Sequence, residues 1–308
     1  MNQVVTIGLC VKNSEKTVGD TIKSVISQDF PHENMEIIVV DGGSKDKTID
    51  IVNNTLTGTK IDASIIFDKG KGLGAARQMV VDNARGNYIL WVDSDVILSK
   101  DFLKRQLDFL KKHTEVGMAR GKSEYCESLL GFLADTQSLF FSILKGVCLS
   151  ATICRTEALR EINGFDKRIK GASEDVDVRI RMLLKGWKVT MNPEATFYHA
   201  PKYTFRSLYR QNSWYGYGDH FISHKYEGLV NIAYKLPPIF FGWGLKLSRK
   251  AYWRYQKKKS FLIPLLCVFI SVAWCTGFVK GHLQGYGHSI KEHEIRKELL
   301  LNARQMTR

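Results

Sequence analysis

The sequence is poor in cysteine and proline, with six of each among 308 residues. No two cysteines form a Cys-x-x-Cys pair, which argues against a disulfide scaffold or a cysteine zinc site and favours reduced thiols. Residues 1–16 lack the basic start, apolar run and cleavage site of a secretory signal, so we expect none there. Charged residues make up 25% and hydrophobic residues 44%, which excludes a disordered protein and allows one large domain with an addition.

The 31 acidic residues are outnumbered by 45 lysines and arginines, and the formal net charge is +14 at pH 7. Such an excess indicates a polyanionic partner, which can be nucleic acid, phosphate or an acidic membrane surface. Residues 246–259 combine seven basic and three aromatic side chains with no acidic one, and residues 260–279 follow without any charge. Because the basic segment borders this apolar run, we expect membrane lipids as the partner and no nucleic acid.

The apolar run has the length of a membrane span, since about 20 helical residues cross a hydrocarbon core of about 30 Å. A buried core helix and a hairpin that returns to the same side stay open as alternatives, and Pro264 and Gly277 weaken a regular helix. We therefore expect an α/β domain (1–226), an interfacial basic segment (227–259), a transmembrane or membrane-inserted helix (260–279) and a basic tail (280–308).

Strand-like and helix-like patterns alternate through the first part of the chain. This alternation predicts a Rossmann-like α/β fold with a mostly parallel sheet, flanked by helices and joined by right-handed crossovers. In such sheets ligands bind at the carboxyl ends of the strands. The predicted strands are 4–11, 35–40, 63–67 and 88–92, with helices near 18–26, 49–56 and 75–84.

Carboxylates follow two of these strands. Asp41 comes after the second, and Asp93 and Asp95 come after the fourth. Two carboxylates at the end of a buried strand make an oxygen-rich site for Mg²⁺ or Mn²⁺, which can bridge a diphosphate. A solvated turn that contains two aspartates is the alternative.

Glu174 and Asp175 open a predicted helix further along the chain. Acidic residues in a first turn interact favourably with the helix dipole, so a capping role is one interpretation. A general base that takes a proton from an attacking hydroxyl is the other.

Arg77 lies in the helix that follows the glycine-rich segment 69–74. It either neutralises phosphate charge or is an ordinary surface arginine. His199 follows another strand-like run, and it is either structural or a metal ligand.

The order of these motifs resembles that of the family 2 glycosyltransferases, which have the nucleotide-sugar-binding GT-A fold. The resemblance covers residues 4–218, and several segments in succession carry it. They are the first strand and helix (5–28), the aspartate turn (37–48), the arginine helix with the Asp-x-Asp motif (72–96), the acceptor-side strand with its Gly-Phe-Asp loop (146–166) and the Glu-Asp helix (173–189).

The resemblance implies a role for each candidate residue. The family implies an inverting transferase that uses a nucleotide diphosphate sugar and Mn²⁺ or Mg²⁺. From the basic segment and the apolar run we expect the enzyme to be membrane-associated, at the cell membrane with a cytoplasmic catalytic domain. Asp175 takes the position of the catalytic base. The expected substrate-binding residues are Asp41 at the nucleobase, Arg77, Asp93, Glu174 and Trp214, and the expected metal ligands are Asp95 and His199.

Residues 210–218 match only part of the Gln-x-x-Arg-Trp motif of processive synthases, so we expect transfer of one sugar per encounter. Trp214 either lines the acceptor site or packs in a core with Tyr217. The presence of Asp175 favours a hydroxyl acceptor on a lipid-linked, polyprenyl-type glycan or a lipid. A polyprenyl phosphate is the second choice, because it is already a nucleophile.

A phosphohydrolase of the haloacid-dehalogenase type is an alternative from another class. Residues 89–98 fit its motif, in which Asp93 would be the phosphorylated nucleophile. That motif usually ends a first strand, whereas three strand–helix units precede Asp93 here.

Overall fold

A computed structural model describes residues 5–124, 148–199, 204–227 and 232–290. The chain divides into two compact units. The sheet unit comprises Met1–Cys126, Ser142–Lys170 and Glu174–Ala200, and the helical unit comprises Glu127–Phe141, Gly171–Ser173 and Pro201–Arg308. Residues 205–225 thus pack with the C-terminal helices, whereas the sequence-based division kept them in the first domain. That division stays a prediction, and residues 291–308 of the basic tail lie outside the described residues.

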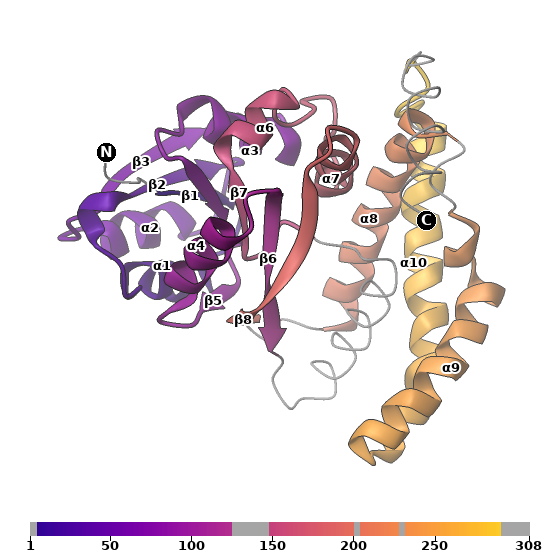
Figure 1. Cartoon of the computed structure of the whole chain (residues 1–308). Coiled ribbons are helices and arrows are strands. Elements are labelled where there is room, and N and C mark those ends of the chain that lie inside the picture. The colour runs from indigo at the N-terminus through magenta and orange to yellow at the C-terminus, as the bar shows by residue number, and fades with distance from the viewer. Residues whose placement is uncertain (1–4, 125–147, 200–203, 228–231, 291–308) are drawn as a thin grey trace. The chain divides into compact units, whose positions relative to one another are not determined.

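The first half of the sheet forms where the alternating pattern predicted it (Figure 1). β1 is parallel to β2 and to β4, and β2 is parallel to β3. These elements are β1 (Val5–Val11), α1 (Val18–Ile26), η1 (His32–Asn34), β2 (Met35–Asp41), α2 (Thr48–Leu56), β3 (Asp62–Phe67), α3 (Leu73–Asn83) and β4 (Tyr88–Trp91).

The second half of the sheet is mixed. The full strand order is β3-β2-β1-β4-β7-β6-β8-β5. β7 is antiparallel to β4 and β6, while β8 is parallel to β6 and antiparallel to β5. The elements are β5 (Val96–Leu98), α4 (Phe102–Lys112), β6 (Val116–Glu124), β7 (Thr152–Arg155), α6 (Thr156–Glu161), α7 (Glu174–Leu184) and β8 (Lys188–His199).

Helices cover both faces of this sheet. Residues of α1, α2 and α4 pack with Ile7, Ile37 and Leu90 in one apolar core. Residues of α3, α6 and α7 pack with Ile38 and Trp91 in another. Because both faces are buried, the central strands read as continuous apolar runs and not as an alternation of apolar and polar residues.

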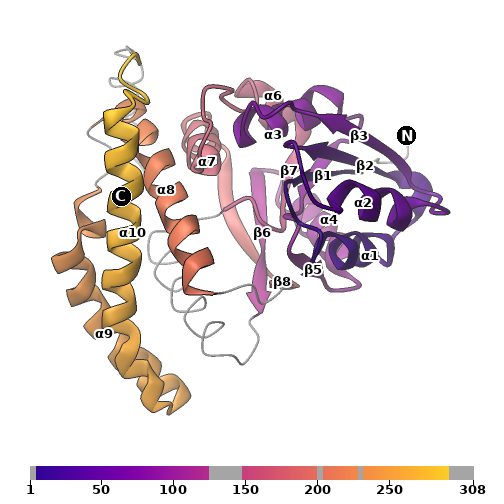
Figure 2. The same cartoon turned by 180° about the vertical axis from the view of Figure 1, so that it is seen from behind.

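The helical unit contains α8 (Phe205–Lys225), η2 (Ala233–Lys235), α9 (Pro237–Tyr255), η3 (Lys258–Leu262) and α10 (Ile263–Leu283). Figures 1 and 2 show α8 and α10 side by side. A Cβ atom on Gly277 of α10 would lie 1.7 Å from the backbone oxygen of Ser213 in α8. Gly277, expected to weaken the helix, thus lets two helices pack closely. Pro264 stands in the first turn of α10, where its missing N–H is not needed.

One helical stretch in the described part of the chain, Lys258–Leu283, is long and apolar enough to cross a membrane. Half of its most apolar part is buried inside the structure. Asp219 of α8 accepts hydrogen bonds from Trp274 of α10 (2.7 Å) and from Ser173 (2.8 Å), and it pairs with Lys235. Several apolar side chains of the stretch are exposed: Phe261, Leu262, Leu265, Val272, Val279 and Leu283.

Candidate active site

Acidic side chains lie at the carboxyl ends of three parallel strands, β2, β3 and β4, and β1 lies between β2 and β4. Asp41 ends β2, Asp68 follows β3 and Asp93 follows β4. The register pairs Val11 with Asp41, and Asp41 with Phe67, so the ends of β1, β2 and β3 lie side by side. Asp68 is buried and was not predicted from the sequence. The same signal as for Asp41, an acidic residue directly after an apolar strand, would have identified it.

Asp41 holds the turn that follows β2. Its carboxylate, 3% exposed, accepts hydrogen bonds from the backbone N–H of Gly43 (3.0 Å) and Ser44 (3.1 Å) and from the Ser44 hydroxyl (2.6 Å). The geometry of this turn is therefore fixed by the residue expected to contact the nucleobase, and that contact stays a prediction.

Arg77 is the centre of the charge arrangement. Its Nη1 lies 2.8 Å from Glu174 Oε1, and its Nη2 lies 3.3 Å from Asp93 Oδ1. The side chains of Arg77 and Glu174 are 6% and 4% exposed, whereas that of Asp93 is 41% exposed. The guanidinium also lies 5.7 Å from the centre of the Trp91 ring. Arg77 is thus a buried, paired arginine, and the surface interpretation is wrong.

The start of α3 is placed by a close backbone approach. Gly72 has a φ of +105°, and a Cβ atom there would lie 2.9 Å from Lys170 Cα. One turn into the helix, Gln78 accepts a hydrogen bond from the backbone N–H of Phe165 (2.5 Å). These contacts tie α3 to the loop that precedes α7, and they hold Arg77 opposite Glu174.

Burial and the charges around Arg77 shift the pKa values of neighbouring groups. Burial raises the pKa of Glu174 to about 7, against the lowering effect of Arg77 and with a further increase from Asp175 and Asp93. Burial likewise raises the pKa of Cys10 to about 12, with Arg77 opposing and Asp93 and Glu174 adding to the rise. Nothing in the sequence context of Cys10 indicated that its thiol is under the influence of these charges.

Asp175 belongs to the same neighbourhood. Its charge acts on Glu174 and Arg77, and together with that of Asp93 it adds to the raised pKa of the half-buried Cys148. Its Oδ1 accepts a hydrogen bond from the backbone N–H of Val176 (2.8 Å), as expected in a first helical turn. The catalytic role of Asp175 stays a prediction.

Asp177, two residues further on, has a structural role. It is fully buried and forms an ion pair with Arg181, which also donates to the backbone oxygen of Ile162. Asp175 and Asp177 also form an Asp-x-Asp sequence, but the carboxylate of Asp177 is engaged by Arg181.

Asp95 and His199 are distant in sequence but close in the sheet. β5 pairs with β8 so that Val96 lies opposite His199, and Asp95 directly precedes Val96. The Asp-x-Asp motif is also joined to the β1 loop, because the hydroxyls of Ser94 and Ser14 are 2.8 Å apart. A carboxylate with an imidazole suits Mn²⁺, whereas Mg²⁺ prefers oxygen ligands alone.

Trp214 is part of the helical unit. It is 40% exposed, and its ring centre is 5.8 Å from that of Tyr215. Tyr217 stacks on Tyr286 instead, at 4.4 Å and 7°. The alternative that Trp214 packs in a core with Tyr217 is therefore wrong, and its place at an acceptor site stays a prediction.

Known proteins resemble this chain in sequence. Two family models match the chain. The model of "Glycosyl transferase family 2" matches residues 6–145, and that of "Glycosyl transferase family group 2" matches residues 88–281. An uncharacterized glycosyltransferase of Haemophilus influenzae is 32% identical over 124 residues, which are 40% of this chain and 48% of the relative. The poly(ribitol-phosphate) beta-N-acetylglucosaminyltransferase TarS of Staphylococcus aureus is 27% identical over 62% of this chain and 34% of the relative. The chain thus spans less than half the length of these two relatives.

Solved structures share the fold. S. aureus TarS 1–349 in complex with UDP has a TM-score of 0.52 and 17% identity, over 92% of each chain. The mannosyltransferase PcManGT from Pyrobaculum calidifontis, in complex with GDP-Man and Mn²⁺, has a TM-score of 0.59 and 16% identity, over 99% of this chain and 87% of that one. With a GT-A sheet, the predicted motifs in order and a family match over more than half of its length, the chain belongs to the family 2 glycosyltransferases.

Proposed function

We propose that this chain transfers one sugar from a nucleotide diphosphate sugar to a hydroxyl group, with inversion at the anomeric carbon. The observation that carries the proposal is the pairing of Arg77 with both Asp93 and Glu174, the residue that directly precedes Asp175 in α7. This buried arginine holds Asp93 and Glu174 in place at the carboxyl edge of a parallel sheet, which is where such sheets bind their ligands.

In this proposal each residue has one task. Asp41 contacts the nucleobase, and the half-exposed Asp93 contacts the ribose while Arg77 keeps it in place. Asp175 accepts the proton of the acceptor hydroxyl as that oxygen bonds to the anomeric carbon. The bond to the nucleoside diphosphate breaks on the opposite face, which inverts the configuration.

Asp95 and His199 would hold a divalent ion, and their donor types fit Mn²⁺. Such an ion supplies positive charge where the departing diphosphate accumulates negative charge. The complex of PcManGT with GDP-Man and Mn²⁺ supports this part of the proposal.

A hydroxyl acceptor fits a site that has a candidate base. The TarS relative is named for transfer to poly(ribitol-phosphate), and we propose a lipid-linked, polyprenyl-type glycan or a lipid as the acceptor here. Polyprenyl phosphate needs no base and is the second candidate. The family match and the position of Asp93 after the fourth strand leave the phosphohydrolase alternative without support.

We further propose that the helical unit attaches the protein to the cytoplasmic face of the cell membrane. Exposed apolar side chains on Lys258–Leu283 and the exposed lysines 257–259 support this, because such lysines attract anionic lipids. Attachment would keep the catalytic unit of the same chain close to a membrane-borne acceptor.

A thermal-shift screen with UDP-, GDP- and dTDP-sugars, with and without Mn²⁺, tests the proposed function. A donor at 100 times its Kd should stabilise the folded chain by about 2.7 kcal/mol, which raises Tm by several degrees. The cognate donor should also lose its sugar to an acceptor in lipid extract. No shift with any nucleotide sugar, with Mn²⁺ present, would contradict the proposal.

A further inference from the structure

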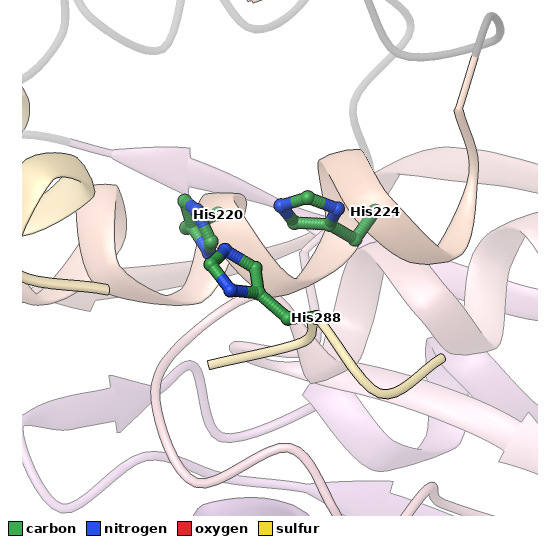
Figure 3. A group of neighbouring side chains, drawn as sticks. All are labelled: His220, His224 and His288. Carbon is green, nitrogen blue, oxygen red and sulfur yellow. The ribbon is translucent and has the colours of Figure 1, made fainter. Parts of the chain in front are cut away.

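Four histidines gather where α8 meets the end of α10. His220 and His224 lie on α8, His282 lies in the last turn of α10, and His288 lies in the turn that follows. Among the described residues, His220, His224 and His288 each offer a ligand nitrogen within 4.8 Å of the other two. Figure 3 shows the three rings grouped between the helix and the turn.

The hydrogen bonding of His220 leaves one of its nitrogens ready to bind a metal. Its Nδ1 lies 2.6 Å from the backbone oxygen of Tyr286, and a carbonyl only accepts, so this nitrogen carries the proton. A second-shell bond of this kind fixes the ring and directs the lone pair of Nε2 towards His282, whose Nδ1 is its hydrogen-bond partner in the structure. His220 is 1% exposed, so its orientation is held by the surrounding packing.

The distances suit a tetrahedral ion. His220 Nε2 lies 3.4 Å from His282 Nδ1. Zn–N bonds of about 2.0–2.1 Å place two tetrahedral ligand nitrogens about 3.3–3.4 Å apart. The ring centre of His288 is 4.9 Å from the ring centre of His224 and 5.1 Å from that of His282. Small side-chain rotations would bring the exposed rings to ligand distance.

The fold builds this arrangement without help from an ion. His220 and His224 are four residues apart, so they share one face of α8. Tyr286 stacks on Tyr217, and its hydroxyl accepts from the backbone N–H of Gly171 (3.3 Å). A Cβ atom on Gly287 would lie 3.1 Å from Phe221 Cα. The turn that carries His288 is therefore pressed against α8.

We propose that His220, His224 and His288 bind a zinc-class transition metal, with His282 as a fourth ligand. Imidazole donors select zinc, copper or nickel over magnesium and calcium, so this site differs in chemistry from the oxygen-rich site of the sheet unit. The exposed rings of His224 and His288 give the ion access from solvent. The bound ion joins α8 to the C-terminal end of α10 and to the turn after it.

The test uses the full chain, purified with a tag that contains no histidine and stripped with a chelator. Zn²⁺ binding is measured by calorimetry and by metal content, and Co²⁺ replaces zinc to report tetrahedral coordination by its visible absorption. We expect one zinc ion per chain, a rise in Tm on adding zinc, and a tetrahedral cobalt spectrum.

His224→Gln and His288→Gln should each weaken zinc binding by more than about 100-fold, since loss of a ligand exceeds the loss of a second-shell partner. Both residues are exposed, so the metal-free variants should melt like the metal-free wild type. His113→Gln, an exposed histidine of the sheet unit, is the matched control and should bind zinc normally. Wild-type binding below one zinc per chain, or no tighter than that of a chain with both His224→Gln and His288→Gln, overturns the proposal.

Discussion

Arg77 Nη1 lies 2.8 Å from Glu174 Oε1, and both side chains are almost completely buried. The pair joins α3 to Glu174, the first residue of α7, and it thereby fixes the start of the helix that carries Asp175. A buried ion pair adds little net stability, but removing one partner leaves an unpaired buried charge. We infer that the pair positions the site more than it stabilises the fold.

Arg77→Met should destabilise the chain by about 3 kcal/mol at pH 8 and by less at pH 5. The pKa of Glu174 is raised to about 7 in the folded chain, so the folded state holds a proton that the unfolded state has released. This contribution to stability is complete below pH 4.5 and is lost as the pH rises towards 7. Arg77 lowers the pKa of Glu174, so without Arg77 this pKa is higher and the loss of stability extends to higher pH. Urea unfolding at both pH values measures it.

Arg168→Met is the control for that variant. Arg168 pairs with Asp166 at 2.7 Å, but its own side chain is half exposed. Its loss should therefore cost about 1 kcal/mol or less at either pH. Equal and pH-independent losses for the two variants would show that Glu174 does not depend on Arg77.

Asp95→Asn should weaken the Mn²⁺-dependent part of nucleotide binding by at least about tenfold. A carboxylate ligand is lost, whereas nucleotide binding without metal should hardly change. Nucleotide titrations with and without Mn²⁺ measure the difference, and Asp82→Asn, half exposed on α3, is the control. If Mn²⁺ enhanced nucleotide binding by the Asp95 variant as much as by the wild type, Asp95 would not be a metal ligand.

Gly277→Ala should destabilise the helical unit by about 2–3 kcal/mol, because its Cβ would lie 1.7 Å from Ser213 O. Gly242→Ala in α9 is the matched control, with no atom within 4 Å of the added methyl group. That change should be neutral or stabilise by about 0.5–1 kcal/mol, since alanine favours a helix. Thermal unfolding of both variants decides, and a neutral Gly277→Ala would contradict the close packing of α8 and α10.

Replacing lysines 257–259 by glutamine should weaken binding to vesicles with anionic lipids. At about 1 kcal/mol for each lysine, the loss is about 150-fold at low salt and smaller at high salt. Vesicle co-sedimentation measures it. The same change at lysines 104, 111 and 112, exposed on the sheet unit, removes the same charge and should have little effect. Equal losses for the two sets would contradict attachment through the helical unit.

The first half of the sheet was predictable because each strand and helix there is a local pattern. Asp41 and Asp93 were found by their place after apolar strands, and Asp68 was overlooked although it has the same context. The second half was not predictable in this way. β5 has three residues and pairs with β8 far along the chain, so neither its existence nor its partner is a local property.

Burial and long-range packing explain the other differences. Nothing near Arg77 in sequence shows that it is buried, because its partner Glu174 comes from another helix. The sequence-based division assigned the helix of residues 205–225 to the first domain. Gly216 and Gly277 let this helix pack closely against α10, and the sequence alone does not show that contact. The histidines of α8 and of the turn after α10 are likewise brought together only by that packing.

Asp175→Asn tests the central claim most directly, with sugar transfer and donor affinity measured on the same preparation. The account predicts that transfer falls by about 10²–10⁴-fold, the usual contribution of a general base, while donor Kd changes less than about threefold. Asp20→Asn, an exposed aspartate on α1, should leave both unchanged. Undiminished transfer by the Asp175 variant would contradict the account.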